Sequence, residues 1–344
     1  MATRTANSVS TARTPQDPAL RAAWQRFLEF DDQSIRQKKT NRRIRAPIIL
    51  LTLLATVLAV VISYKEANDF IKSISEALRV AIIIVPLVAA GLMAYAYQFY
   101  PSLSWITYRV AAELVRQQIY LYRMEAGEYT QKDTQSQQKL LLGKIGEAND
   151  LVGDMGATVP YLKTPIEDLA EQVKSHTDDE RDDGFSSMVG DDYVTQRVDK
   201  QCEWYVVRAL DNFRKLRVWR ILVIIFTGMS SALAALGGEP LVAITTAVGV
   251  ALTMYIQLQM YGGTYAIYQS TANRVRTELS KWDILTPEQK QDPAEAAALV
   301  YTIERIFQEE RDAWFQQASQ AQMATEKSLM KKAGFEAEEG EAGR

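Results

Sequence analysis

The chain has very few of the residues that form disulfides or bind metals. Its 344 residues include one cysteine, Cys202, and one histidine, His176. A single thiol excludes an internal disulfide, and so short a supply of both residue types excludes most structural zinc sites. The acidic stretch 178–192 offers carboxylates, but it lacks the spacing of a calcium-binding loop. We therefore expect no metal site and no cofactor.

A catalytic pattern is also missing. The Gly-Gly pairs at 237–238 and 262–263 lack the Lys and Ser/Thr of a phosphate-binding loop. His176 lies in a polar stretch, where a solvated side chain is the commoner interpretation. The formal net charge of −3 provides no basic field that would attract nucleic acid. These observations favour a protein that is not an enzyme and has no nucleic-acid partner.

Several stretches without a charged residue are long enough to cross a bilayer as helices. Residues 221–238 carry no charge, and neither do residues 240–273. A membrane-spanning helix needs ~20 mostly apolar residues, because every backbone polar group must be paired inside it. The turn Gly237-Gly238-Glu239-Pro240 between the two runs indicates a helical hairpin. We predict an all-α integral membrane protein with four transmembrane helices in two hairpins and long cytoplasmic helical extensions. The predicted spans are about 46–64, 80–100, 220–238 and 240–258.

Basic residues gather before the first and third spans. Arg214, Lys215, Arg217 and Arg220 precede the third span, whereas the hairpin loops have no excess of positive charge. The positive-inside rule then places both termini and the middle region in the cytoplasm. The cluster before the first span is also expected to contact anionic lipid head groups. It consists of Arg36, Lys38, Lys39, Arg42, Arg43 and Arg45.

The layout of the chain repeats. We predict a disordered N-terminus at 1–18, a two-span repeat at 19–130, and a helical and acidic linker region at 131–195. A second two-span repeat at 196–320 and a polar tail at 321–344 follow. Each repeat carries a cytoplasmic apolar seam with heptad-like spacing, typical of packed helices. The seams are Trp105, Tyr108, Ala112, Val115, Ile119 and Tyr122, and Val198, Cys202, Tyr205, Ala209, Phe213 and Leu216. We expect the acidic stretch 178–192 between them to be a solvated linker.

Small and weakly polar residues recur in the second hairpin. In the fourth span they are spaced by four, which places them on one helical face. One interpretation is a pore-lining stripe, and the other is close helix packing through small residues. The set is Thr245, Gly249, Thr253 and Gln257, with Thr227 and Ser231 from the third span. No span has an ionisable residue in its middle, which disfavours a coupled transporter.

The soft motifs of both halves resemble the SLATT family. In the first half these are Trp24 and residues 108–116 and 120–129. In the second half they are residues 203–205, 276–282 and 303–314. SLATT domains are two-span domains associated with SMODS nucleotide synthases and SLOG sensors, and they are also catalogued as a domain of unknown function. The resemblance implies two tandem copies in a bacterial inner-membrane protein of the pore-forming effector kind. The chain has no synthase or sensor pattern of its own, so a sensor would be a separate cytoplasmic protein.

Three functional hypotheses follow from the sequence. The first is a homo-oligomeric pore or channel, and the second is a membrane-anchored scaffold that recruits partners through its cytoplasmic helices. A transporter is the third and least favoured hypothesis. The expected partners are the lipid bilayer, further copies of the chain and the separate sensor.

Overall fold

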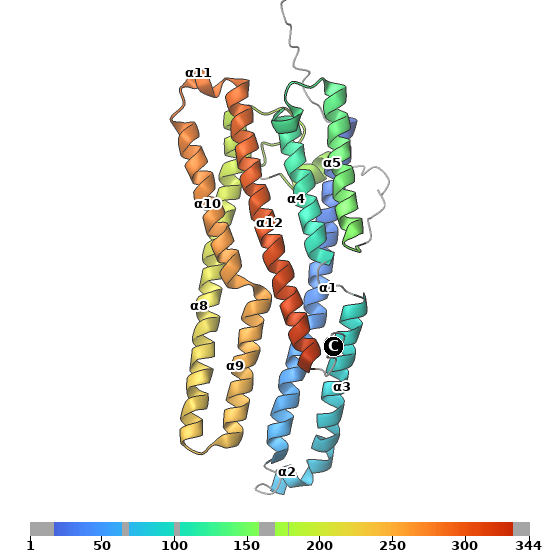
Figure 1. Ribbon diagram of the computed structural model, residues 1–344, viewed down its shortest axis with the longest axis vertical. Coiled ribbons are helices and arrows are strands. Elements are labelled where there is room, and N and C mark those ends of the chain that lie inside the picture. The colour runs from blue at the N-terminus through green and yellow to red at the C-terminus, as the bar shows by residue number, and fades with distance from the viewer. Residues whose placement is uncertain (1–16, 64–68, 100–103, 158–168, 178, 333–344) are drawn as a thin grey trace, which may run out of the picture. The chain divides into compact units, whose positions relative to one another are not determined.

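The computed structural model describes residues 17–63, 69–99, 104–157, 169–177 and 179–332, and these residues form helices and turns without a strand. The predicted all-α fold is therefore confirmed (Figure 1). The predicted disordered segment lies outside the described residues, apart from its last two positions. The elements are α1 (Pro18–Ser63), α2 (Asp69–Ser73), α3 (Ser75–Phe99), α4 (Ser104–Arg123), η1 (Gly127–Tyr129), α5 (Thr134–Asp154), α6 (Leu169–Lys174), α7 (Gly190–Tyr193), η2 (Val194–Val198), α8 (Asp199–Ala235), α9 (Glu239–Gln259), α10 (Tyr261–Asp283), α11 (Pro287–Lys290) and α12 (Pro293–Lys332).

The chain forms two compact units, and each draws on both halves of the sequence. Unit 1 consists of Met1–Asp32, Thr107–Val206 and Gln269–Asp312. Unit 2 consists of Gln33–Ile106, Val207–Tyr268 and Ala313–Arg344. Helices from the first and second halves thus share a core in each unit. The proposed tandem domains at 19–130 and 196–320 stay a prediction at the level of sequence.

Unit 1 contains five of the six residues of the first predicted seam and three of the six residues of the second, and these eight side chains are buried. On α4, Ala112, Val115 and Ile119 are fully withdrawn from solvent. On α8, Cys202 and Tyr205 are 5% and 3% exposed. A π-helical turn, η2, connects α7 to α8, and its Val198 is fully buried. These faces form the interior of the unit, because a side chain every three or four residues returns to the same side of a helix.

Two helices of unit 1 begin with side-chain caps. Thr286 and Gln289 form a reciprocal capping box at the start of α11, with Pro287 at the first helical position. The carboxylate of Asp292 accepts a hydrogen bond from the backbone N–H of Ala294, at 2.9 Å, where α12 begins. A proline at the first turn loses nothing, since its missing N–H would have no partner inside the helix.

Unit 2 contains the apolar hairpin formed by α8 and α9 (Figure 1). The turn between them has Gly237 at φ +75°, a conformation that glycine adopts without steric cost. The hairpin is held by a contact of Trp219 with Tyr255, whose ring centroids are 4.8 Å apart. A hydrogen bond of 2.7 Å joins the hydroxyls of Ser230 and Thr246. The predicted second hairpin is therefore present as a pair of packed helices.

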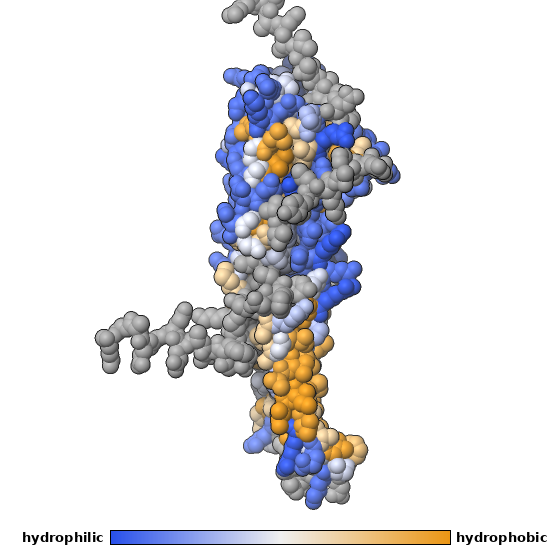
Figure 2. All heavy atoms as spheres, turned by 90° about the vertical axis from the view of Figure 1, so that its right-hand side faces the viewer, coloured by the Kyte–Doolittle hydropathy of each residue, from blue (hydrophilic) through white to orange (hydrophobic). Residues whose placement is uncertain are grey.

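Three helices are long and apolar enough to cross a bilayer within the described residues. They lie in Ser75–Ala96, Gly190–Ala235 and Leu241–Asp283. The first predicted span appears as a shorter apolar segment, Leu50–Ile62. The count of four spans stays a prediction. Figure 2 shows a hydrophobic surface over one part of the chain. On α3, Val80, Ile83, Ile84, Leu87 and Val88 are exposed, as lipid-facing positions would be.

The first predicted span does not form a helix of its own. Its described residues continue α1, which extends from Pro18 to Ser63 with Pro47 in its interior. The missing N–H costs a single backbone hydrogen bond, and the neighbouring turns keep theirs. An apolar segment has no water to pair its backbone, so continuing the helix satisfies the other polar groups.

Candidate functional site

A cluster of polar and charged side chains lies inside unit 1, where α4, the η2–α8 segment and α12 meet. At its centre the Arg197 guanidinium and the Glu304 carboxylate approach to 3.5 Å, and their side chains are 3% and 1% exposed. The hydroxyl of Tyr193 donates a hydrogen bond of 3.0 Å to the same Glu304 oxygen. Among the described residues, the second carboxylate oxygen, Oε2, has no hydrogen-bond partner. Burial raises the pKa of the Glu304 carboxyl, although Arg197 and the Tyr193 hydroxyl oppose that shift.

Aromatic rings enclose the Arg197 guanidinium. Its central carbon lies 4.5 Å from the centroid of the Tyr120 ring and 5.3 Å from that of the Phe307 ring. Tyr120 comes from α4 and Phe307 from α12, so one cation contacts helices from both halves of the sequence. Such cation–π contacts strengthen when the cation is withdrawn from water.

Gln117 extends the cluster along α12. Its side-chain amide donates to the Glu304 carbonyl at 3.0 Å and to Gln308 at 3.3 Å, and its oxygen accepts from Arg311 at 3.2 Å. One buried amide therefore links three positions of α12 to α4. The arrangement fixes how the two helices align, since a shift along either axis would leave these groups without partners.

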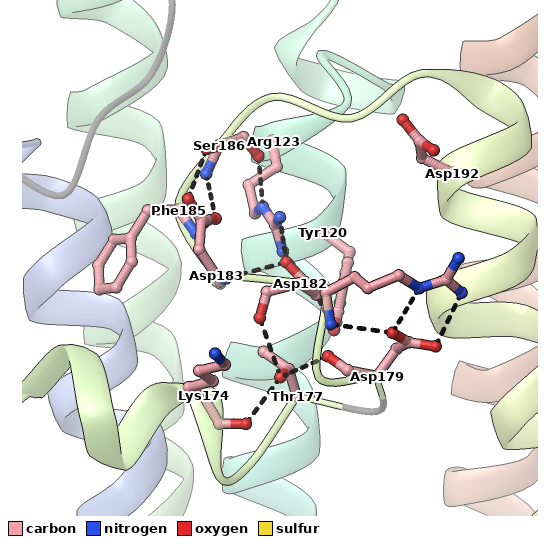
Figure 3. A network of polar contacts seen from close by, with 12 residues as sticks. Tyr120, Arg123, Lys174, Thr177, Asp179, Asp182, Asp183, Phe185, Ser186 and Asp192 are labelled. Carbon is pink, nitrogen blue, oxygen red and sulfur yellow. Dashed lines mark hydrogen bonds and ion pairs between the residues drawn. The ribbon is translucent and has the colours of Figure 1, made fainter.

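The segment 177–186 is strapped onto α4 by a second buried ion pair (Figure 3). The Arg123 guanidinium donates to both carboxylate oxygens of Asp182, at 2.6 and 3.1 Å, and both side chains are 1% exposed. Its Nε–H donates to the Ser186 carbonyl at 2.9 Å. The indole N–H of Trp24 on α1 donates to the Gly184 carbonyl at 2.7 Å. We call residues 177–186 the acidic strap.

The acidic strap corrects the expectation of a solvated linker. Asp182 and Phe185 are each 2% exposed, and Asp183 accepts hydrogen bonds from the backbone N–H groups of Phe185 and Ser186 at 2.8 Å. Sequence composition suggested solvation because the stretch is rich in carboxylates, but Arg123 supplies a buried counter-charge 59 residues away. His176 also lies against the fold, with its ring 6.1 Å from that of Phe27. No group of three or more potential metal ligands is found among the described residues.

The four-residue stripe of α9 divides into two parts. Thr245 is 8% exposed, and a Cβ added to Gly249 would lie 3.7 Å from the Thr227 hydroxyl of α8. Thr253 and Gln257 are exposed. The structure thus brings Gly249 and Thr227 together and leaves the side chains of Thr253 and Gln257 exposed.

The hydroxyls of this hairpin mostly bond to their own helices. Thr227, Ser231 and Thr253 each donate to the carbonyl four residues earlier, at 2.8, 3.2 and 2.9 Å. Thr245 does the same at 2.9 Å. This pairing satisfies a hydroxyl in apolar surroundings and leaves its oxygen able to accept a further hydrogen bond. Whether the stripe lines a pore stays a prediction.

The basic cluster lies on the part of α1 that belongs to unit 2. Arg36, Lys38, Lys39 and Arg43 are exposed, and the Lys38 ammonium lies 5.0 Å from the centroid of the Trp105 ring. The side chains of Arg42 and Arg45 lie outside the described set. An exposed row of cations next to a tryptophan is typical of the membrane–water interface. Contact with lipid head groups stays a prediction.

Sequence reasoning missed the residues of the buried cluster, although a weak signal was present. Glu304 follows Ile303 and precedes Ile306 and Phe307, so a charge lies among apolar positions of one amphipathic helix. Arg197 likewise precedes Val198, where the second seam begins. A charge within an apolar face indicates a buried partner, but the sequence alone does not say which residue that partner is.

Apolar helical hairpins together with a helical unit containing buried ion pairs define a multi-pass membrane protein. The family model described as SMODS and SLOG-associating 2TM effector domain 1, SLATT_1, matches residues 193–314. Residues 193–314 of the chain therefore belong to the SLATT family. Residues 25–137 match a second model, Protein of unknown function (DUF4231). Whether the two halves are copies of one domain stays a prediction, because they match different models.

The remaining comparisons gave no relative. No curated protein and no solved structure was found to match the chain. The match to SLATT_1 covers α8, α9 and α10 and ends within α12, so it includes the apolar hairpin and Glu304. Neither family description names an enzymatic reaction.

We predict that Gly184→Ala destabilises the protein. Gly184 has φ +78°, and an added Cβ would lie 2.2 Å from Val173 Cγ1 and 3.3 Å from the Trp24 ring. Strain and overlap together should cost about 2–4 kcal/mol in the free energy of unfolding. Gly143→Ala on α5 is the matched control, because nothing lies within 4 Å of its added Cβ. It should be neutral or stabilising by ~0.5–1 kcal/mol in thermal unfolding. Equal melting temperatures for the two variants would contradict this account of the strap.

We also predict that Glu310 makes stability fall with rising pH. Burial raises the pKa of its carboxyl to about 7 and nearby Glu113 adds to the shift, whereas the Tyr205 hydroxyl, which donates to Glu310 at 3.1 Å, opposes it. The folded protein therefore keeps a proton that the unfolded chain releases between about pH 4.5 and 7. Stability from this group is present below that window and lost as the pH rises through it.

Removing the titrating group should remove that loss. In Glu310→Gln the melting temperature should change less between pH 5 and pH 8 than in the wild type, by the equivalent of roughly 1–2 kcal/mol. The exposed neighbour Glu309, which pairs with Arg274, provides the control variant Glu309→Gln, and this variant should keep the wild-type pH dependence. The account fails if Glu310→Gln and Glu309→Gln show the same pH profile.

Proposed function

We propose that the protein is an oligomeric, pore-forming membrane effector without enzymatic activity. The observation that carries the proposal is the α8–α9 hairpin, which combines membrane-spanning length with exposed hydroxyl and amide side chains and no charge in its middle. Thr227, Ser231, Thr253 and Gln257 are exposed on it. The hydroxyls are paired with their own helix and can still accept a hydrogen bond, but the Gln257 amide would be costly facing lipid, so a water-filled lumen or a neighbouring hairpin is the better environment for this face. The matched domain is described as an effector, which agrees with this role.

The exposure of the apolar helices supports assembly into an oligomer. In their most apolar windows only 6%, 6% and 12% of residues are buried within a single chain. Lipid can cover the aliphatic positions, but it cannot pair the exposed amide of Gln257. Further copies of the same hairpin would supply both a partner for polar groups and the wall of a pore. We propose a homo-oligomer on this basis.

The scaffold alternative has less support. It required the cytoplasmic seams to be open for a partner, yet Val115, Ile119 and Val198 are fully buried within unit 1. A scaffold would have to bind through a different surface. The separate cytoplasmic sensor stays part of the proposal, because a pore-forming effector must be kept closed until it is needed.

We propose that the protein lies in the inner membrane with both termini and unit 1 in the cytoplasm. This orientation is inferred by the positive-inside rule from the basic residues of α1 and from those before the third span. A cysteine at the exposed position Asp150 of α5 tests it, in a Cys202→Ser background. Asp150→Cys should react with a membrane-impermeant maleimide only after the cells are opened. Labelling in intact cells with a permeable outer membrane would reverse the proposed topology.

Substitution at Gly249 should reduce conduction. The site tolerates a methyl group at 3.7 Å from Thr227, but a leucine would separate α8 from α9 or narrow a lumen. Gly249→Leu should therefore lower dye release from liposomes severalfold, whereas Gly249→Ala should behave like the wild type. Gly91→Leu on α3 is the matched control, because nothing lies within 4 Å of an added Cβ there.

Cysteine labelling separates a lumen from a packing seam. Cysteines placed singly at positions 245, 249, 253 and 257, with Cys202→Ser removing the buried native thiol, should react with a small aqueous reagent wherever water reaches. Positions 253 and 257 should react fastest, since their native side chains are exposed. If all four stay unreactive in a conducting preparation, α9 does not line the pore.

A further inference from the structure

Unit 1 contains a cavity of about 660 Å³ that neither buried ion pair occupies. Its walls come from the end of α4, the segment before α7, and the turn that joins α10, α11 and α12. This volume lies in the range of cavities that hold small organic ligands. The lining residues are Met124, Met188, Val189, Gly190, Asp191, Leu285, Pro287, Lys290, Gln291, Pro293 and Ala296.

Most of the lining residues are apolar. Met124 and Ala296 are 9% and 7% exposed and therefore belong to the buried part of the wall. Trp282 and Ala296 pack close to Gly190 because it has no side chain: an added Cβ would lie 2.7 Å from the Trp282 ring and 3.3 Å from the Ala296 methyl group. Methionine side chains adapt to irregular apolar ligands, so this wall suits an aliphatic or aromatic group.

Two opposite charges stand together at the polar side of the cavity. The Lys290 ammonium lies 3.8 Å from Asp191 Oδ1, which accepts a hydrogen bond of 2.9 Å from the Trp282 indole. The Lys290 ammonium is also 4.0 Å from Asp283. Within the described residues it makes no hydrogen bond, and Asp191 Oδ2 accepts none. The Lys290 and Asp191 side chains, 23% and 65% exposed, thus both line the cavity, and each can form a hydrogen bond to a further charged group.

We propose that this cavity binds a small zwitterion with an apolar body, of which an apolar free amino acid is the simplest example. Its ammonium would bind Asp191, its carboxylate would bind Lys290, and its side chain would lie on the methionine-lined wall. A purely anionic ligand is disfavoured by Asp283 beside Lys290, and a purely cationic one by the Lys290 ammonium. The proposal does not depend on pore formation.

Binding of leucine to the full chain in lipid nanodiscs tests the proposal by isothermal titration calorimetry. Leucine, methionine and phenylalanine should bind saturably. 4-Methylpentanoate, which lacks the ammonium, and 3-methylbutylamine, which lacks the carboxylate, should each bind about tenfold or more weakly than leucine, because each loses one charge-assisted contact. Absence of saturable binding by all three amino acids would overturn the proposal. Equal affinity for leucine and 4-methylpentanoate would overturn the role of Asp191.

Variants of the two charged residues assign the contacts. Lys290→Met and Asp191→Asn should each weaken leucine binding about tenfold or more, and Asp191→Asn keeps an acceptor for the Trp282 indole. Lys281→Met is the matched control, because the Lys281 ammonium binds Glu278 at 2.8 Å and does not line the cavity. Lys290→Arg keeps the charge and should retain most of the affinity. Equal loss in Lys290→Arg and Lys290→Met, with both variants melting like the wild type, would contradict a charge contact at this position.

Discussion

Withdrawing full charges from water is the constraint on which unit 1 depends. Arg123 with Asp182, and Arg197 with Glu304, have side chains between 1% and 3% exposed. Each pair is stable only while both members are present, since a buried charge left alone costs about 3–5 kcal/mol. Helices that bring the partners together are therefore fixed in register as well as in contact. Apolar burial alone would have allowed the same helices to slide with little loss.

The polar side chains of the two units have different kinds of hydrogen-bond partner. Unit 1 joins distant residues, such as Gln117 and Arg311, through side-chain hydrogen bonds across helices. In the hairpin of unit 2 the hydroxyls of Thr227 and Ser231 instead turn back to their own backbone. Backbone pairing of this kind needs no partner on a neighbouring helix. Across the hairpin, the Ser230 hydroxyl bonds to the Thr246 hydroxyl and to the Val242 carbonyl. Helices satisfied in this way can exchange neighbours more freely than those of unit 1.

Local patterns predicted local structure well. The seams on α4 and α8 and the glycine turn at Gly237 each depend on residues within a few positions of one another. Such spacing is visible in short stretches of sequence.

Long-range partners were out of reach of the same reasoning. The sequence of the acidic strap is typical of a solvated linker, since nothing near Asp182 in the sequence indicates that Arg123 is its partner. Glu304 appeared as one charge on an amphipathic helix, and only the fold places Arg197, 107 residues earlier, against it. Spacing alone also does not predict burial along one helical face. Thr245 and Gln257 lie on the same face of α9, but Thr245 is buried and Gln257 is exposed, because α8 covers only part of that face.

The π-helical turn η2 sets the angular position of everything that follows it in α8. A π turn contains one residue more than an α turn needs, and each residue of a helix accounts for about 100° of rotation. If the segment 194–198 were rewound as α-helix, Cys202, Tyr205 and Ala209 would swing away from the interior that now holds them. The extra residue thus determines which face α8 presents: without it, the helix would continue along the same axis but be rotated about it.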